Sequence, residues 1–364
     1  MVHHSVQPSG SRGSAGARRR AASVASLIAL SLAACDIPTS APKWSTRWVV
    51  PTDSLSIAVA SLLPSAVSIA PDSSAFRVTV DSTEFLQSLG QACEQCRAVN
   101  GSVAPKPAFA TVFGSSIALP QDVASVMMSR GSATVQLFNG FGFDPLRPSA
   151  LARGSLTITL ASRGATLASV TVDGADTPLA PNQWLSRTLP LASATLAGPI
   201  TVSVALDSPA GDPTWVDTTR QLTVVAKLDE VDVSEASIRV DNKSIDPSQV
   251  ELNFDNVDQR LIDRVEDGAL RFEIGNPFQV GGSIQATLQT PTTTVVKTFT
   301  VEPGAATQRL ELTNAELRSI LGQPSATLVV SGALSAPSGV AVIRPRQAIS
   351  IGSRVEVALT PTEQ

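Results

Sequence analysis

The chain of 364 residues has almost none of the residue types on which most enzymes depend. Its only histidines are His3 and His4, and it contains no tyrosine. Histidine is the usual acid–base group at neutral pH and a common ligand of zinc and haem. Past residue 4, the sequence therefore excludes Ser-His-Asp and Cys-His catalysis, HExxH zinc sites and His-ligated haem. An enzyme here would have to use carboxylates, lysine or a Ser-Lys pair, and we expect a protein that is not an enzyme and has no cofactor.

The first 34 residues have the layout of a secretory signal. Three arginines, Arg18 to Arg20, precede residues 21–34, which are all Ala, Ser, Val, Leu or Ile. A basic segment followed by a short apolar segment is typical of an export signal. The apolar run has 14 residues, whereas a helix needs roughly 20 to span a bilayer. We therefore expect residues 1–34 to be removed on export.

Leu32-Ala33-Ala34-Cys35 ends this segment and resembles the lipobox of bacterial lipoproteins. The resemblance implies cleavage before Cys35 and acyl chains, including palmitate, on that residue. Cleavage before Cys35 would place Leu32 three residues before the cut, where an ordinary signal peptidase requires a small residue. The alternative is that Cys35 is an unmodified cysteine near a signal. Two or more acyl chains give stable anchoring. The resemblance implies an exported lipoprotein on the periplasmic or outer face of the cell envelope; Asp36 leaves inner and outer membrane undecided.

The net charge of the chain limits which partners it can bind. The chain has 27 basic and 31 acidic residues, and Arg12 and Arg18 to Arg20 precede Cys35. The chain from Cys35 onward therefore has 23 basic and 31 acidic residues, a net charge of −8. Nucleic acids and anionic lipid headgroups need a basic surface. We expect membrane contact through the acyl chains, an envelope protein partner, and no nucleic acid.

Segments in which apolar and polar residues alternate recur along the chain and predict antiparallel β-strands. The clearest are residues 55–60, 76–80, 133–138, 155–160, 201–206, 269–274 and 355–359. Two short helices are also expected, at 258–266 and at 313–321, where Thr313 and Glu316 form a capping box. Without regular alternation of strands and helices, nothing favours a parallel sheet.

Four sequence blocks occur twice in the same order. GSATVQLFNGF at residue 131 aligns with GALRFEIGNPF at residue 268, and further matches begin at 154 and 282, 202 and 330, and 220 and 346. Repeats at a nearly constant offset indicate duplication. We predict a mainly β protein of two tandem, related antiparallel β-sandwich domains of immunoglobulin-like type, with one or two short helices each. The segments before the first blocks, 122–130 and 259–267, are candidate helices.

Each copy resembles the β-sandwich of the type 2 late-embryogenesis-abundant family, in which a strand ends in Asn-Pro. Asn276-Pro277-Phe278 carries this motif, whereas the first copy reads Asn139-Gly140-Phe141. The resemblance implies binding of apolar or protein partners. The predicted organisation is a signal peptide at 1–34, a lipidated tether leading into the first strand at 35–52, domain 1 at 53–228 with a CxxC loop, and domain 2 at 229–364.

Cys93 and Cys96 are the only cysteine pair if Cys35 is acylated. Such a pair outside the cytoplasm is normally oxidised. We expect a structural disulfide in the loop between Gly90 and Asn100; redox exchange and free thiols stay open as alternatives. Zinc would require further Cys or His ligands that the chain lacks.

Residues 228–267 contain 12 acidic residues, and Asp229, Glu230 and Asp232 open this stretch. They form the one candidate calcium site, because hard carboxylate oxygens bind Ca²⁺. The alternative is a solvated acidic face. No DxDxDG loop is present, so we expect no metal.

Tryptophan is rare, and Trp184 and Trp215 are the two farthest from the N-terminus. Because tyrosine is absent, an aromatic platform for sugars is disfavoured. The favoured function is a lipid-anchored, non-catalytic envelope protein with a structural, scaffolding or partner-binding role. The alternatives are a carrier of an apolar ligand such as a lipid and a carboxylate-dependent, glycosidase-type enzyme.

Overall fold

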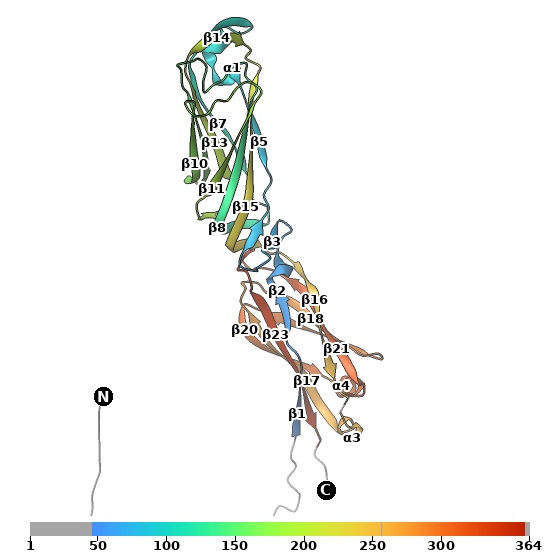
Figure 1. The fold of residues 1–364 in the computed structure, drawn as a ribbon. Helices are drawn as coiled ribbons and strands as arrows, with labels where there is room; N and C mark the ends of the chain where they lie inside the picture. Colours follow the sequence, from blue (N-terminus) through green and yellow to red (C-terminus); the bar gives the residue numbers. More distant parts are fainter. Residues whose placement is uncertain (1–45, 256, 361–364) are drawn as a thin grey trace, which may run out of the picture. The chain divides into compact units, whose positions relative to one another are not determined.

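The computed structural model describes residues 46–255 and 257–360, and these form a mainly β protein (Figure 1). The signal segment and Cys35, with its predicted acylation, lie outside the described residues. The strands pair antiparallel in sheets whose inward side chains are aliphatic or aromatic. The predicted β-sandwich class is confirmed.

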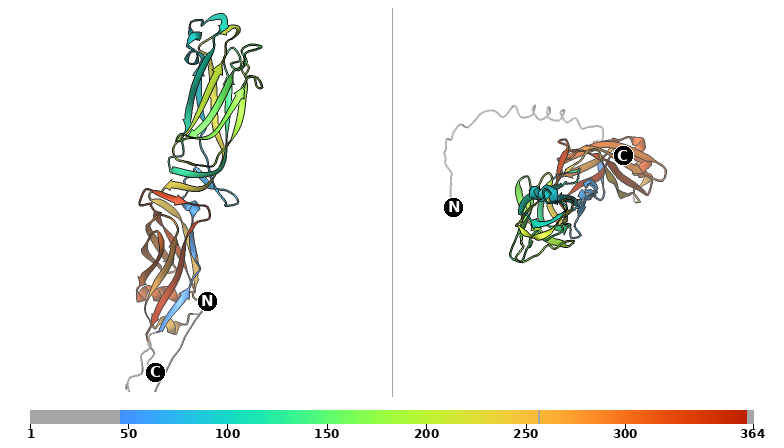
Figure 2. Two further views of the ribbon diagram at one scale, coloured as in Figure 1. Left: turned by 90° about the vertical axis from the view of Figure 1, so that its left-hand side faces the viewer. Right: turned by 90° about the horizontal axis from the view of Figure 1, so that it is seen from above.

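Sandwich 1 has two facing sheets whose main strands run lengthwise (Figure 2). In the first sheet the order is β11 (Trp184–Leu191), β8 (Val123–Asn139), β15 (Gln221–Arg239) and β5 (Thr83–Ser88). In the second it is β10 (Ala165–Asp173), β9 (Ser155–Ser162), β13 (Ile200–Ser208) and β7 (Phe109–Ile117). The long strands β8 and β15 of the first sheet extend it further, to eight strands in all, by pairing with short strands.

Sandwich 2 has the same strand order. Its first sheet contains β20 (Gly304–Leu312), β17 (Val265–Asn276) and β23 (Ala348–Leu359), and β23 also pairs with β1 (Thr46–Pro51) and β2 (Leu55–Ala58). Its second sheet contains β19 (Thr294–Val301), β18 (Gly282–Gln289), β21 (Ser325–Leu334) and β16 (Lys243–Asn253). The duplicated blocks fall on matching strands: β8 and β17, β9 and β18, β13 and β21, β15 and β23.

Strand pairing differs from the predicted domain boundaries at two places. The boundary between 228 and 229 falls inside β15, which runs from Gln221 to Arg239. β2, inside the predicted domain 1, hydrogen-bonds to β23 of sandwich 2. Sheet membership depends on pairing between residues far apart in sequence, which local composition does not reveal. Sandwich 1 is thus inserted in the chain between β2 and β16.

Short elements complete the fold. The remaining strands are β3 (Val67–Ile69), β4 (Phe76–Val78), β6 (Ser102–Lys106), β12 (Ala194–Leu196), β14 (Gly211–Val216) and β22 (Val340–Ile343). The helices are η1 (Val59–Leu62), a 3₁₀ turn, α1 (Leu89–Ala92), α2 (Glu94–Arg97), α3 (Gln259–Ile262) and α4 (Asn314–Leu321).

Helix predictions had mixed outcomes. Around α4, the Thr313 hydroxyl accepts from the Glu316 N–H and the Glu316 carboxylate accepts from the Thr313 N–H, so the capping box is confirmed. α3 is shorter than predicted and begins after Asp258, whose carboxylate caps it. Residues 122–130 are not a helix, because β8 begins at Val123 and pairs there with β15. Long-range pairing overrides a weak local helix preference.

The strongest sign of duplication is a buried asparagine at the end of β8 and of β17. Asn139 Nδ2 donates to the Phe143 and Leu179 carbonyls, at 2.9 and 2.7 Å, and its Oδ1 accepts from the Phe141 N–H at 2.9 Å. Asn276 makes the equivalent bonds to two carbonyls, at 2.8 and 3.0 Å, and to the Phe278 N–H at 3.0 Å. Each asparagine therefore fixes a chain reversal that no water reaches.

Candidate functional site

A buried lysine lies at one end of sandwich 1. Lys106, the last residue of β6, is 1 % exposed, and its Nζ donates to Ser208 Oγ at 2.7 Å and to the Pro209 carbonyl. Ser208 Oγ in turn donates to the Pro145 carbonyl at 2.6 Å. The three bonds join β6, the end of β13 and the loop after β8.

Aromatic rings surround this lysine. Its Nζ lies 4.7 Å from the ring centre of Phe109 and 5.4 Å from that of Phe143. Burial lowers the pKa of Lys106 to about 8, and Asp207 opposes that shift. The rings favour the charged form too, through their negative faces.

Lys106 and Ser208 are the Ser-Lys pair left open by composition, but their hydrogen bonds run the wrong way for activating a nucleophile. A lysine acting as base accepts the serine proton, whereas the Ser208 proton is directed to the Pro145 carbonyl. Ser208 is also completely buried. This network is suited to fastening three segments together.

The CxxC loop contains the expected disulfide. Cys93 and Cys96 are bonded, with their Cα atoms 5.2 Å apart, and both are buried. Cys93 caps α2, since its Sγ accepts from the Cys96 N–H at 3.1 Å. Shielding from solvent keeps thiols away from both bonded sulfurs, so the bond has the features of a structural crosslink.

The three candidate calcium ligands do not converge. Asp232 is buried and pairs with Arg130 at 2.5 Å and with Arg77 at 3.6 Å, while Asp229 accepts from Thr134 at 2.6 Å. Glu230 is exposed. Over residues 46–255 and 257–360, no group of three or more His, Cys, Asp or Glu side chains is placed to hold a metal ion. Asp232 pairs with two arginines there.

A row of three apolar side chains and one threonine crosses the outer face of the first sheet of sandwich 1; its two end members are exposed and its two middle members are half-buried. Trp184 on β11 is opposite Phe138 on β8, which is opposite Thr223 on β15, which is opposite Leu86 on β5. Trp184 is 57 % exposed and Leu86 is 51 % exposed. The rings of Phe138 and Trp184 lie 5.1 Å apart between centres. We name these four residues the outer row.

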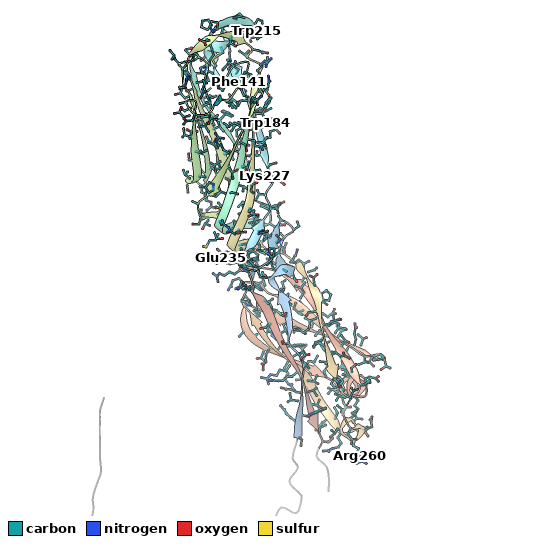
Figure 3. All side chains as sticks on the ribbon, viewed as in Figure 1. Phe141, Trp184, Trp215, Lys227, Glu235 and Arg260 are labelled. Atoms are coloured by element: carbon teal, nitrogen blue, oxygen red, sulfur yellow. A yellow bond between two sulfur atoms is a disulfide. The ribbon has the colours of Figure 1, made fainter. Side chains whose placement is uncertain are left out.

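Trp215 lies elsewhere on sandwich 1. It is on β14, opposite Val103 on β6, and is 55 % exposed. Figure 3 shows Trp215 at the far end of sandwich 1 and Trp184 along its side. The two exposed tryptophans therefore belong to separate surfaces.

Sequence reasoning missed Phe138, Leu86 and Lys106. Phe138 closes an apolar alternation and reads as one more strand residue, although it lies on the outward side with Gln136. Its register with Trp184 depends on a pairing across 46 residues. One signal was available: Leu137 and Phe138 are adjacent, so one of them must face outward.

The larger hollows lie at the surface. One of about 600 Å³ is lined by polar and apolar residues of 65–66, 79–83 and 116–121. Another of about 540 Å³ lies over β17, β20 and β23, and one of about 320 Å³ lies over β7, β9 and β13. The interiors are occupied by packed side chains such as Phe272 and Phe299, stacked 4.7 Å apart. No helix within the described residues is long and apolar enough to cross a membrane.

Comparisons with known proteins give distant likenesses. No family model and no curated protein matches the chain. A protein of Parabacteroides distasonis ATCC 8503 described as secreted has 12% identity and a TM-score of 0.32, covering 86% of this chain and 99% of its own. Tandem CBM51 modules of a family 98 glycoside hydrolase from Streptococcus pneumoniae have 7% identity and a TM-score of 0.17, covering 84% and 99%. Likeness at this level identifies neither a family nor a ligand.

Proposed function

We propose that the chain is a non-catalytic binding protein of the cell envelope, exported and held to a membrane by acyl chains on Cys35. The observation that carries the binding role is the outer row, in which Trp184, Phe138 and Leu86 expose apolar surface on one sheet face. Exposed apolar surface rimmed by polar residues marks interaction sites. The burial of Lys106 and Ser208 and the direction of their hydrogen bonds support a role without catalysis.

The anchor lies close to sandwich 2 along the chain. β1, in sandwich 2, begins at Thr46, 11 residues after Cys35. A chain of that length spans at most about 40 Å. An acylated Cys35 would therefore hold sandwich 2 near the membrane surface.

Two measurements test this proposal. Mass spectrometry of the membrane fraction is expected to find an acylated N-terminal Cys35, and Cys35→Ser is expected to lose that modification. The acylated protein, inserted in phosphatidylcholine vesicles, is expected to bind purified envelope fragments, and Trp184→Ala is expected to weaken that binding. An unmodified Cys35 would contradict the membrane anchor. Envelope binding that is unchanged in Trp184→Ala would contradict the outer row as the binding face.

A further inference from the structure

The composition of the outer row and its surroundings indicates which ligand it binds. The row crosses four neighbouring strands in strict register. Strands lie about 4.8 Å apart, so the row is about 14 Å long. It is one residue wide, because the next outward positions along each strand are mainly polar. A narrow apolar strip fits an extended polymer better than a broad protein surface.

Carboxamides and hydroxyls flank the strip. One neighbouring row contains Ser186, Gln136, Val225 and, at the edge strand, Glu84; the other contains Gln221 and Ser88. Gln136 and Gln221 are exposed, and neither side chain hydrogen-bonds to another described residue. A carboxamide both donates and accepts, as a sugar hydroxyl does. Gln136 and Gln221 are therefore free to bind a ligand rich in hydroxyls, whereas the Ser88 hydroxyl is engaged in capping α1.

The basic groups nearest the strip along β15 are paired with carboxylates. Arg220, three residues before Thr223, lies 3.7 Å from Asp217 and donates to the Gly140 carbonyl. Lys227, four residues after Thr223, lies 3.6 Å from Asp229. An anionic polymer or lipid surface needs unpaired positive charge. The chain from Cys35 onward also has a net charge of −8. The electrostatics therefore favour an uncharged ligand.

We propose that the outer row binds a neutral polysaccharide, whose sugar rings stack on Trp184 and Phe138 while Gln136 and Gln221 hydrogen-bond to its hydroxyls. An indole face buries the C–H face of a pyranose ring, and its neighbours supply the polar contacts that orient it. Trp184, the most exposed member of the row, makes the main contact with the sugar. This inference rests on the proposed function, since it names the ligand of the same face. It departs from the expectation that the lack of tyrosine disfavours a sugar platform, because Phe138 lies beside Trp184 in the same row.

The test uses the acylated protein in detergent micelles and four neutral polymers: glucomannan, hydroxyethyl cellulose, laminarin and xylan. Affinity electrophoresis is expected to show retardation by at least one. Trp184→Ala is expected to weaken that binding tenfold or more, as for other exposed tryptophan anchors, and Trp184→Phe to retain part of it. Trp215→Ala is the matched control, because Trp215 is equally exposed on another surface; it is expected to bind as wild type.

Several results would overturn the inference. These are no retardation by any of the four polymers, equal losses in Trp184→Ala and Trp215→Ala, or a Trp184→Ala protein that binds as wild type. A change in oligomeric state on Trp184→Ala, seen by analytical ultracentrifugation, would assign the row to contact between copies and overturn the inference too. If envelope fragments still bind through Trp184 while the four polymers do not, the proposed function stands and the polysaccharide inference fails.

Discussion

At the scale of single residues, buried polar groups give the clearest test of the fold. Lys106 loses its hydration, and that loss lowers its pKa to about 8 from 10.5. Between pH 8 and pH 10.5 the unfolded chain keeps a proton that the folded chain has released. Stability contributed by this group therefore rises with pH in that window and is constant below pH 8.

Lys106→Met tests that titration, because methionine fills the space without a charge. The difference in the free energy of unfolding between wild type and variant is expected to be flat from pH 6 to pH 8. From pH 8 to pH 10.5 it should shift in favour of wild type, by at most about 1.4 kcal/mol per pH unit. Urea denaturation across this range measures it. A difference that does not change with pH would mean that the rings and carbonyl hold the proton on Lys106.

Asn139→Ala and Asn276→Ala form a second residue-scale test, one in each sandwich. Each removes three hydrogen bonds and leaves two buried carbonyls and an N–H without partners. We expect a loss of about 3 kcal/mol in either variant, measured by denaturant unfolding. Gln285→Ala, at an exposed position of β18 where the amide side chain bonds to no other described residue, is the control. A cost below about 0.5 kcal/mol for either buried asparagine would contradict its role in the chain reversal.

At the scale of elements, the CxxC loop is a local crosslink. It closes only four residues, between Cys93 and Cys96. The gain from restricting the unfolded chain grows with loop length, so this bond should contribute only about 2 kcal/mol. The Cys93→Ala/Cys96→Ala variant is expected to fold with its stability lowered by about that amount, as measured by thermal unfolding. A variant that fails to fold would show that packing around the two buried sulfurs dominates.

Strands were predictable where one face alone is buried. β9 was expected at 155–160 and runs from Ser155 to Ser162, because its inward Leu and Ile alternate with outward Thr and Ser. The paired strands β6 and β14 were missed, since Pro105 and Pro213 interrupt both. Proline has no N–H group to donate. It is tolerated there because β6 and β14 pair only with each other, so their outer edges need no hydrogen-bond donor.

The outer row could not be predicted from strand assignment alone. Its members come from four strands, and their meeting depends on registers set across the whole of sandwich 1. No strand was predicted at Trp184, and nothing local in the sequence pairs it with Phe138. The disulfide, by contrast, lies within four residues and was predictable.

At the scale of the whole molecule, the edge strands β2 and β5 belong to different sandwiches, although they lie close together in the sequence. β5 pairs with β15 in sandwich 1, and β2 pairs with β23 in the equivalent position of sandwich 2. Sandwich 2 therefore takes one edge from residues before sandwich 1 and the rest from residues after it. Its folding needs both ends of the chain, whereas the eight lengthwise strands of sandwich 1 all lie between β5 and β15; only the short strand β22 joins their first sheet from later in the sequence.

Ile57→Ala tests this arrangement, because Ile57 is buried in β2 opposite Ile349 of β23. Truncating a buried isoleucine costs about 2–5 kcal/mol, and the loss should fall on sandwich 2. Hydrogen exchange is expected to speed up in β23 and β17 and to stay unchanged in β8 and β13. Phe85→Ala in β5 is the matched variant, with the opposite pattern expected. Faster exchange in β8 and β13 on Ile57→Ala would mean that β2 supports sandwich 1, as the predicted boundary at residue 53 implied.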